Sequence, residues 1–171
     1  NINYKQHYMY LKISNRGEMD PQALTLLGAS SKRSDDTKIG MFGSGNKYAI
    51  AYFLRENIGI DIYSGEKQIV VHTEKETFRE NSFEVIYVDN QKTSITTSSG
   101  PQWVLWKAIR EIYSNALDEG FIEMEMVSSI VPKKDETHFY IEATGEVVKL
   151  HDEFYRYFAI GKRELFSIGE R

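Results

Sequence analysis

Glu111-Ile112-Tyr113-Ser114-Asn115-Ala116-Leu117-Asp118 is the stretch that decides how the rest of this chain is interpreted. Glu111, Asn115 and Asp118 are spaced by four and three residues, which places their side chains on one stripe of a helix. Apolar residues form a separate stripe that can pack against a core: Leu105, Ile109, Ile112 and Ala116. A general base beside an amide that can hold a cation is suited to splitting a phosphate ester.

A second informative stretch, residues 40–47, reads Gly-Met-Phe-Gly-Ser-Gly-Asn-Lys. Its three glycines precede an expected helix near 46–57 and allow the backbone to approach a ligand closely. The N–H groups at the start of that helix can bind an anion, and Lys47 adds a positive charge. The alternative is a tight turn whose glycines serve only its conformation.

Two familiar phosphate loops do not fit this stretch. The P-loop pattern requires a lysine directly after the last glycine, but Asn46 lies between Gly45 and Lys47. The dinucleotide fingerprint would require glycine where Tyr48 stands.

The remaining patterns predict an α+β fold with mostly antiparallel strands and a few helices on one face of the sheet. We expect further helices at 102–119, ended by Gly120, and from Pro21, capped by Asp20 and stopped at Gly28. Asn15 to Gly17 is interpreted as a turn, and 29–38 and 91–101 as polar connections. Strands are expected at 4–14, 58–62, 68–73, 83–88, 121–128 and 137–149.

The composition limits the class of protein. The 171 residues predict a single domain over 1–171, with 150–171 as a possible start of a following segment, and we expect an excerpt of a longer protein. A net charge of -4 gives no indication of nucleic-acid binding. The chain lacks cysteine, a signal-peptide pattern and an apolar run of about 20 residues, so we expect no membrane contact and a cytoplasmic location.

Together the two stretches resemble the GHKL ATPases, which include DNA gyrase B, the ninety-kilodalton heat-shock chaperones, histidine kinases, MutL and the MORC proteins. Residues 111–118 match the family motif Glu-x-x-x-Asn-Ala-x-Asp at every specified position. By this resemblance Glu111 polarises the attacking water, Asn115 carries Mg²⁺, and Asp118 supports the site or the nucleotide.

Residues 40–47 resemble the later glycine box of the family, closest to its chaperone and MORC form. The resemblance implies that this box binds the terminal phosphates of ATP, and that the preceding stretch begins a lid containing Ser31 and Lys32. The implied cofactor-binding residues of the box are Gly40, Phe42, Gly43, Ser44, Gly45, Asn46 and Lys47.

The chain departs from the family in two ways. The Glu-Asn helix follows the lid and the glycine box instead of preceding them, which a circular permutation would produce without moving residues in space. The adenine motif Asp-x-Gly-x-Gly is incomplete: its best match is Asn15-Arg16-Gly17, where Asn15 can still accept a hydrogen bond from adenine. A competing match at 142–145 ranks lower because no lid follows it.

The resemblance implies a two-layer Bergerat-type sandwich in permuted order. It also implies Mg²⁺-dependent ATP binding and slow hydrolysis that drive lid closure, with ATP and ADP as ligands and an ATP-dependent homodimer as the assembly. The alternative is a non-catalytic nucleotide-binding regulatory or scaffold module with a degenerate site. The permuted order predicts that Asn115 contacts the glycine stretch.

Overall fold

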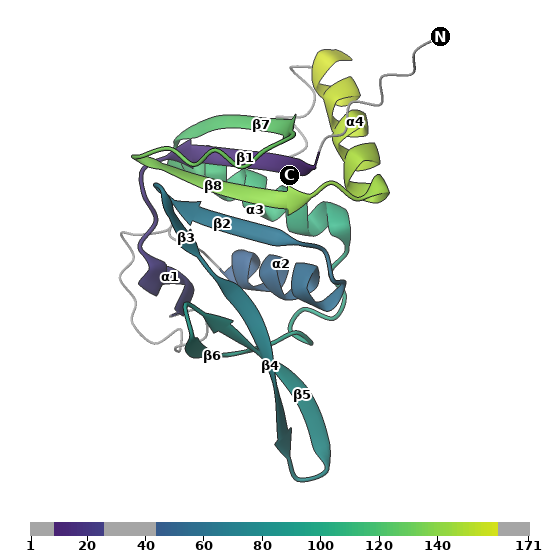
Figure 1. The fold of residues 1–171 in the computed structure, drawn as a ribbon. Helices are drawn as coiled ribbons and strands as arrows, with labels where there is room; N and C mark the ends of the chain where they lie inside the picture. The colour runs from purple at the N-terminus through teal and green to yellow at the C-terminus, as the bar shows by residue number, and fades with distance from the viewer. Residues whose placement is uncertain (1–8, 26–43, 161–171) are drawn as a thin grey trace.

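A computed structural model describes residues 9–25 and 44–160 of the chain (Figure 1). The elements follow in the order β1 (Tyr10–Arg16), α1 (Pro21–Thr25), α2 (Ser44–Arg55), β2 (Ile60–Ser64), β3 (Lys67–Ile69), β4 (Val71–Phe78), β5 (Asn81–Val88), β6 (Gln91–Thr96), α3 (Leu105–Gly120), β7 (Phe121–Val127), β8 (Glu136–Glu142) and α4 (Gly145–Ile160). None of these described helices is long and apolar enough to cross a membrane.

The strands form two antiparallel sheets. The larger has the order β3-β2-β8-β1-β7, and the smaller has the order β4-β5-β6. The hairpin of β4 and β5 projects away from the larger sheet (Figure 1). β1, the first strand in the described part of the chain, lies between β7 and β8, so that Ser14 is opposite Glu123 on one side and His138 on the other. This pairing joins the beginning of the chain to the segment that follows α3.

The core lies between the larger sheet and two helices that pack side by side, α2 and α3 (Figure 1). The apolar stripe predicted for α3 is confirmed, because Ile109, Ile112 and Ala116 are buried and Leu105 packs against the core. The strands contribute alternate apolar side chains, and α2 contributes its own buried face: Leu11, Ile13, Ile62, Ile141, Ala49, Ile50 and Phe53. The helix that carries Glu111 and Asn115 is thereby held at a fixed position on the sheet.

Polar side chains are buried on adjacent strands of the same sheet, a feature that we did not predict from the sequence. Lys12 Nζ lies 2.5 Å from Glu123 Oε1, and the Lys12 residue is only 7% exposed. His138 is completely buried, and its Nε2 lies 2.8 Å from Glu136 Oε2. Burial lowers the pKa of His138, although the hydrogen bond to the carboxylate of Glu136 acts in the opposite direction.

We expect acid to destabilise this fold from about neutral pH downward. Burial lowers the pKa values of His138 and His151 below 6.5, so in that range the unfolded chain binds protons that the folded protein does not. The contribution of these two histidines to the free energy of unfolding is therefore complete above pH 6.5. As the pH decreases below this value, the free energy of unfolding falls by up to about 1.4 kcal/mol per pH unit for each histidine.

Denaturant unfolding between pH 7.5 and 5.5 measures this slope. His138→Gln should reduce the slope without abolishing it, because His151 still titrates. A slope unchanged in His138→Gln would show that this histidine does not titrate with unfolding.

Several local predictions are confirmed. α2 and α3 lie where helices were expected, and Gly120 has the left-handed φ of +99° that suits a helix terminus. Asp20 Oδ1 accepts a hydrogen bond from the N–H of Gln22 at 2.9 Å, as a helix cap does. The expected stop at Gly28 and the connection at 29–38 lie outside the described residues.

Three local predictions are wrong. The expected turn at Asn15 continues β1 through Arg16, because β7 and β8 pair with both sides of it. The polar segment from residue 91 contains β6, in which Thr93 Oγ1 donates to the carbonyl of Ile86 at 2.7 Å. The expected strand at 137–149 ends at Glu142, and α4 begins at Gly145, with Thr144 Oγ1 accepting from Val147 N at 3.3 Å.

Candidate functional site

Two of the predicted site residues on α3, Glu111 and Asn115, meet the first turn of α2. Asn115 Nδ2 donates to Asn46 Oδ1 at 2.6 Å, across 69 residues of sequence. The expected contact between Asn115 and the glycine stretch is therefore confirmed at Asn46; of that stretch the structure describes residues 44–47.

Glu111 lies against Gly45 in the same region. A Cβ atom built on Gly45 would lie 2.0 Å from Glu111 Oε1 and 2.2 Å from Glu111 Cδ, far inside van der Waals contact. Gly45 does not have a left-handed φ, so its lack of a side chain matters here for space and not for backbone conformation. The carboxylate of Glu111 is thus placed beside the start of α2 by a glycine that leaves room for it.

The first turn of α2 gives this region its electrostatic character. The first four N–H groups of a helix have no partner within the helix, and the aligned peptide dipoles place partial positive charge there. α2 begins at Ser44, so Gly45 and Asn46 belong to this first turn. Asn46 is only 1% exposed, and among the described residues its Nδ2 has no hydrogen-bond partner. The site therefore combines a carboxylate, two amides and helix-terminal N–H groups.

Among the described residues, the side chains of Lys47 and Asp118 make no interaction with Glu111, Asn115 or Asn46. Lys47 Nζ lies 5.0 Å from the centre of the Tyr48 ring, and the side chain borders a small gap that Leu24 of α1 also lines. Asp118 is exposed near the end of α3. Both remain predictions as cofactor-binding residues.

The predicted adenine motif lies at the end of β1. Asn15 is 9% exposed, and its Nδ2 donates to the carbonyl of Arg16 at 2.9 Å, which leaves Oδ1 as the atom that can accept from a ligand. Gly17 has a φ of +85° and donates its N–H to the carbonyl of Asp135 at 2.7 Å. A Cβ on Gly120 would lie 3.5 Å from Arg16 Cβ, so this end of β1 is beside the end of α3.

The competing adenine match occupies the other end of β1. Glu142 pairs with Tyr10, and its Oε2 accepts from the N–H of Gly59 at 2.8 Å. Thr144 caps α4. These contacts give residues 142–145 a structural role, distant along β1 from Asn15.

The other predicted phosphate-binding residues are not described. Five of them lie outside the described part of the chain: Ser31, Lys32, Gly40, Phe42 and Gly43. The side chain of Ser44 is also outside it. Their roles remain predictions from the resemblance.

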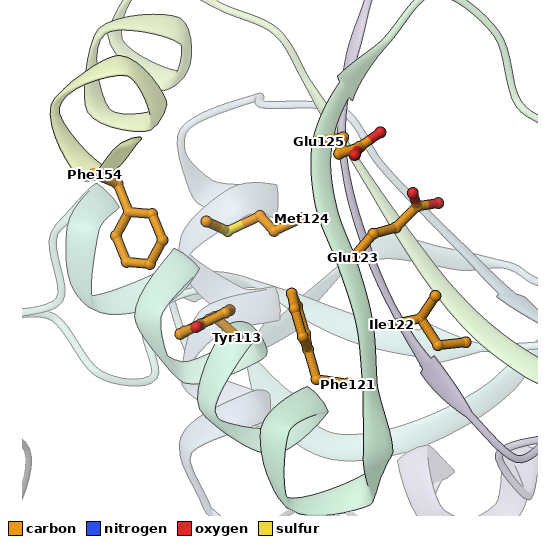
Figure 2. A pocket seen from close by; sticks show the side chains of 7 residues that line it. All are labelled: Tyr113, Phe121, Ile122, Glu123, Met124, Glu125 and Phe154. Atoms are coloured by element: carbon orange, nitrogen blue, oxygen red, sulfur yellow. The ribbon is translucent and has the colours of Figure 1, made fainter. Parts of the chain in front are cut away.

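A pocket of about 270 Å³ lies elsewhere, between α3, β7 and α4 (Figure 2). The rings of Tyr113, Phe121 and Phe154 border it, and Met124 points to the same side of β7, whereas the carboxylates of Glu123 and Glu125 point away (Figure 2). No predicted site residue lines this pocket. The sequence did not reveal it because its aromatic residues belong to separate elements and share no spacing pattern.

The side chains at the α2–α3 contact fit a metal ion that is coordinated mainly by water and by the phosphates of a bound nucleotide. Among the described residues there is no group of three or more His, Asp or Glu side chains that could hold a metal ion. An amide oxygen is a suitable ligand for Mg²⁺, which usually keeps several waters and takes other ligands from substrate phosphates. Asn115 engages its Nδ2 with Asn46, so its Oδ1 is the atom that remains for such a role.

No protein-family model, curated protein or solved structure matches the chain. The resemblance to GHKL ATPases therefore rests on the motifs at 111–118 and 40–47 alone. The geometry of the α2–α3 contact is the independent observation beside it.

Proposed function

We propose that this chain binds ATP together with Mg²⁺ and hydrolyses it slowly, at the contact between α3 and the first turn of α2. The observation that carries the proposal is the Asn115–Asn46 hydrogen bond beside the close approach of Glu111 to Gly45. Two motifs that are far apart in the sequence converge there, and each supplies groups that phosphoryl transfer requires.

Each residue has a defined role in this proposal. Asn115 Oδ1 would hold Mg²⁺, which supplies charge neutralisation for the phosphates when it is bound. The N–H groups of the first turn of α2 bind the terminal phosphate oxygens. Glu111 accepts a proton from the attacking water and orients it. Such positioning and charge stabilisation are most of what phosphoryl transfer asks of a protein.

The permuted order of a Bergerat-type fold belongs to the same proposal. β1 pairs with β7, and β7 directly follows α3. A chain that ran from β7 into β1 would therefore meet Glu111 and Asn115 first, the Asn15 motif next and the glycine stretch last. That is the order of motifs in the family.

Calorimetric titration tests the proposal directly. The parent protein should bind ATP with Mg²⁺ and lose much of this affinity when the metal is chelated. Asn115→Ala should lower the affinity for Mg²⁺·ATP at least about tenfold, because a metal ligand is lost. Asn81→Ala, an exposed substitution on the distant β4–β5 hairpin, is the matched control and should bind like the parent.

The proposal is rejected if millimolar Mg²⁺·ATP gives no binding to the folded parent. If Asn115→Ala binds Mg²⁺·ATP as tightly as the parent, the chain has a nucleotide site but Asn115 is not its metal ligand.

The second candidate function is a non-catalytic nucleotide-binding regulatory or scaffold module. Two observations favour it over an ATPase: Asn15 stands where the family has aspartate, and Lys47 lies against Tyr48. An asparagine can accept from adenine but brings no negative charge, which weakens base recognition. Turnover by the parent and its response to Glu111→Gln distinguish the two candidates.

A further inference from the structure

Asn46 contains two buried polar atoms with different surroundings. Its Oδ1 accepts from Asn115 Nδ2 at 2.6 Å, whereas its Nδ2 has no hydrogen-bond partner among the described residues. The residue is 1% exposed, so bulk water does not solvate this donor freely. Buried amide donors are nearly always paired, which makes an unpaired one at a proposed ligand site informative.

The orientation of this amide is coupled to that of its neighbour. Rotating the Asn46 amide by half a turn would bring its Nδ2 against Asn115 Nδ2, and two donors cannot bond to each other. The observed hydrogen bond therefore couples the orientations of the two amides. It leaves Asn115 with a free acceptor, Oδ1, and Asn46 with a free donor, Nδ2.

We propose that Asn46 is a positioning residue that links the phosphate end of the nucleotide to the metal ligand. Its Oδ1 holds the amide of Asn115 with Oδ1 available to Mg²⁺, and its Nδ2 donates to a phosphate oxygen of the bound nucleotide. This inference rests on the proposed function. It adds that phosphate binding and metal binding are coupled through one side chain of α2.

The coupling has a measurable consequence. ATP and Mg²⁺ raise each other's affinity by the same factor, and part of this factor comes from the direct bond between metal and phosphate. If phosphate holds Asn46 and Asn46 holds Asn115, a further part depends on Asn46. A side chain that only filled space at the α2–α3 contact would not affect this factor.

Two substitutions distinguish the roles of the oxygen and the nitrogen of the Asn46 amide. Asn46→Asp keeps an acceptor for Asn115 but replaces the donor by a charged oxygen that repels phosphate. Asn46→Ala removes both groups. Calorimetry with ATP over a series of Mg²⁺ concentrations measures the affinity and the coupling factor for each variant, with Asn81→Ala as the control and thermal unfolding as the check on folding.

We expect Asn46→Asp to lower the affinity for Mg²⁺·ATP about tenfold or more, since a buried donor to an anion is replaced by a negative charge. Asn46→Ala should also raise the Mg²⁺ concentration needed for half-maximal ATP binding. Folded variants with the parent's ATP affinity and Mg²⁺ requirement would overturn the role of Asn46 while leaving the proposed function intact. A parent that binds no Mg²⁺·ATP would overturn both.

A measurement on the unaltered protein covers the case in which the variants fail to fold. The side-chain amide resonance of Asn46 in nuclear magnetic resonance spectra should shift on addition of Mg²⁺·ATP, and its hydrogens should exchange more slowly with water. An Asn46 amide that does not respond when ATP is bound would overturn the inference.

Discussion

Glu111→Gln is expected to abolish ATP turnover while Mg²⁺·ATP still binds. Glutamine has nearly the same shape, so it can occupy the same space beside Gly45, but its neutral amide cannot accept the proton of the attacking water. Loss of a general base typically lowers kcat by about 10²–10⁴-fold. Phosphate release under saturating Mg²⁺·ATP measures the rate, and calorimetry measures binding.

Glu119→Gln is the matched control for this experiment. Glu119 lies on the same helix and is exposed, so the substitution changes the charge of α3 equally without altering the site. The control should hydrolyse ATP at the parent rate. If Glu111→Gln hydrolyses ATP at the parent rate, Glu111 is not the general base. A parent that binds ATP without turnover would favour the regulatory or scaffold module.

Gly45→Ala is expected to lower turnover to a similar degree by moving Glu111. The added Cβ would lie 2.0 Å from Oε1 and 2.5 Å from Cγ of Glu111, so the Glu111 side chain must adopt another rotamer. Because the clash is with the end of a flexible side chain, and alanine favours helices over glycine by up to about 1 kcal/mol, the free energy of unfolding should change little.

The comparison that isolates this effect is Gly145→Ala. A Cβ at Gly145 meets no atom within 4 Å, and the residue begins α4, so the same substitution there should leave turnover unchanged. If Gly45→Ala acts through Glu111, the double variant Gly45→Ala, Glu111→Gln should be no slower than Glu111→Gln alone. A Gly45→Ala protein that hydrolyses ATP like the parent would show that the position of Glu111 is not critical.

Much of α3 could be predicted from sequence because the information is local. The 3.6-residue period of its apolar residues fixes which face is buried, and Gly120 ends the helix with a φ that other residues rarely adopt. The strand predicted at 143–149 is wrong because it relied on local preference alone. Its two valines favour a strand by local preference, but the cap at Thr144 and the burial of Val147 support a helix there.

The sequence by itself determined the amphipathic helix, its Glu-Asn-Asp stripe and the glycine-rich stretch that leads into α2, because each depends on residue types at short, fixed spacings. Only the tertiary structure decided that β1 lies between β7 and β8, that Asn46 holds Asn115, and that Gly45 leaves space for Glu111. Those contacts join residues distant in sequence and depend on how strands pair and helices pack in the whole fold, which no local pattern specifies.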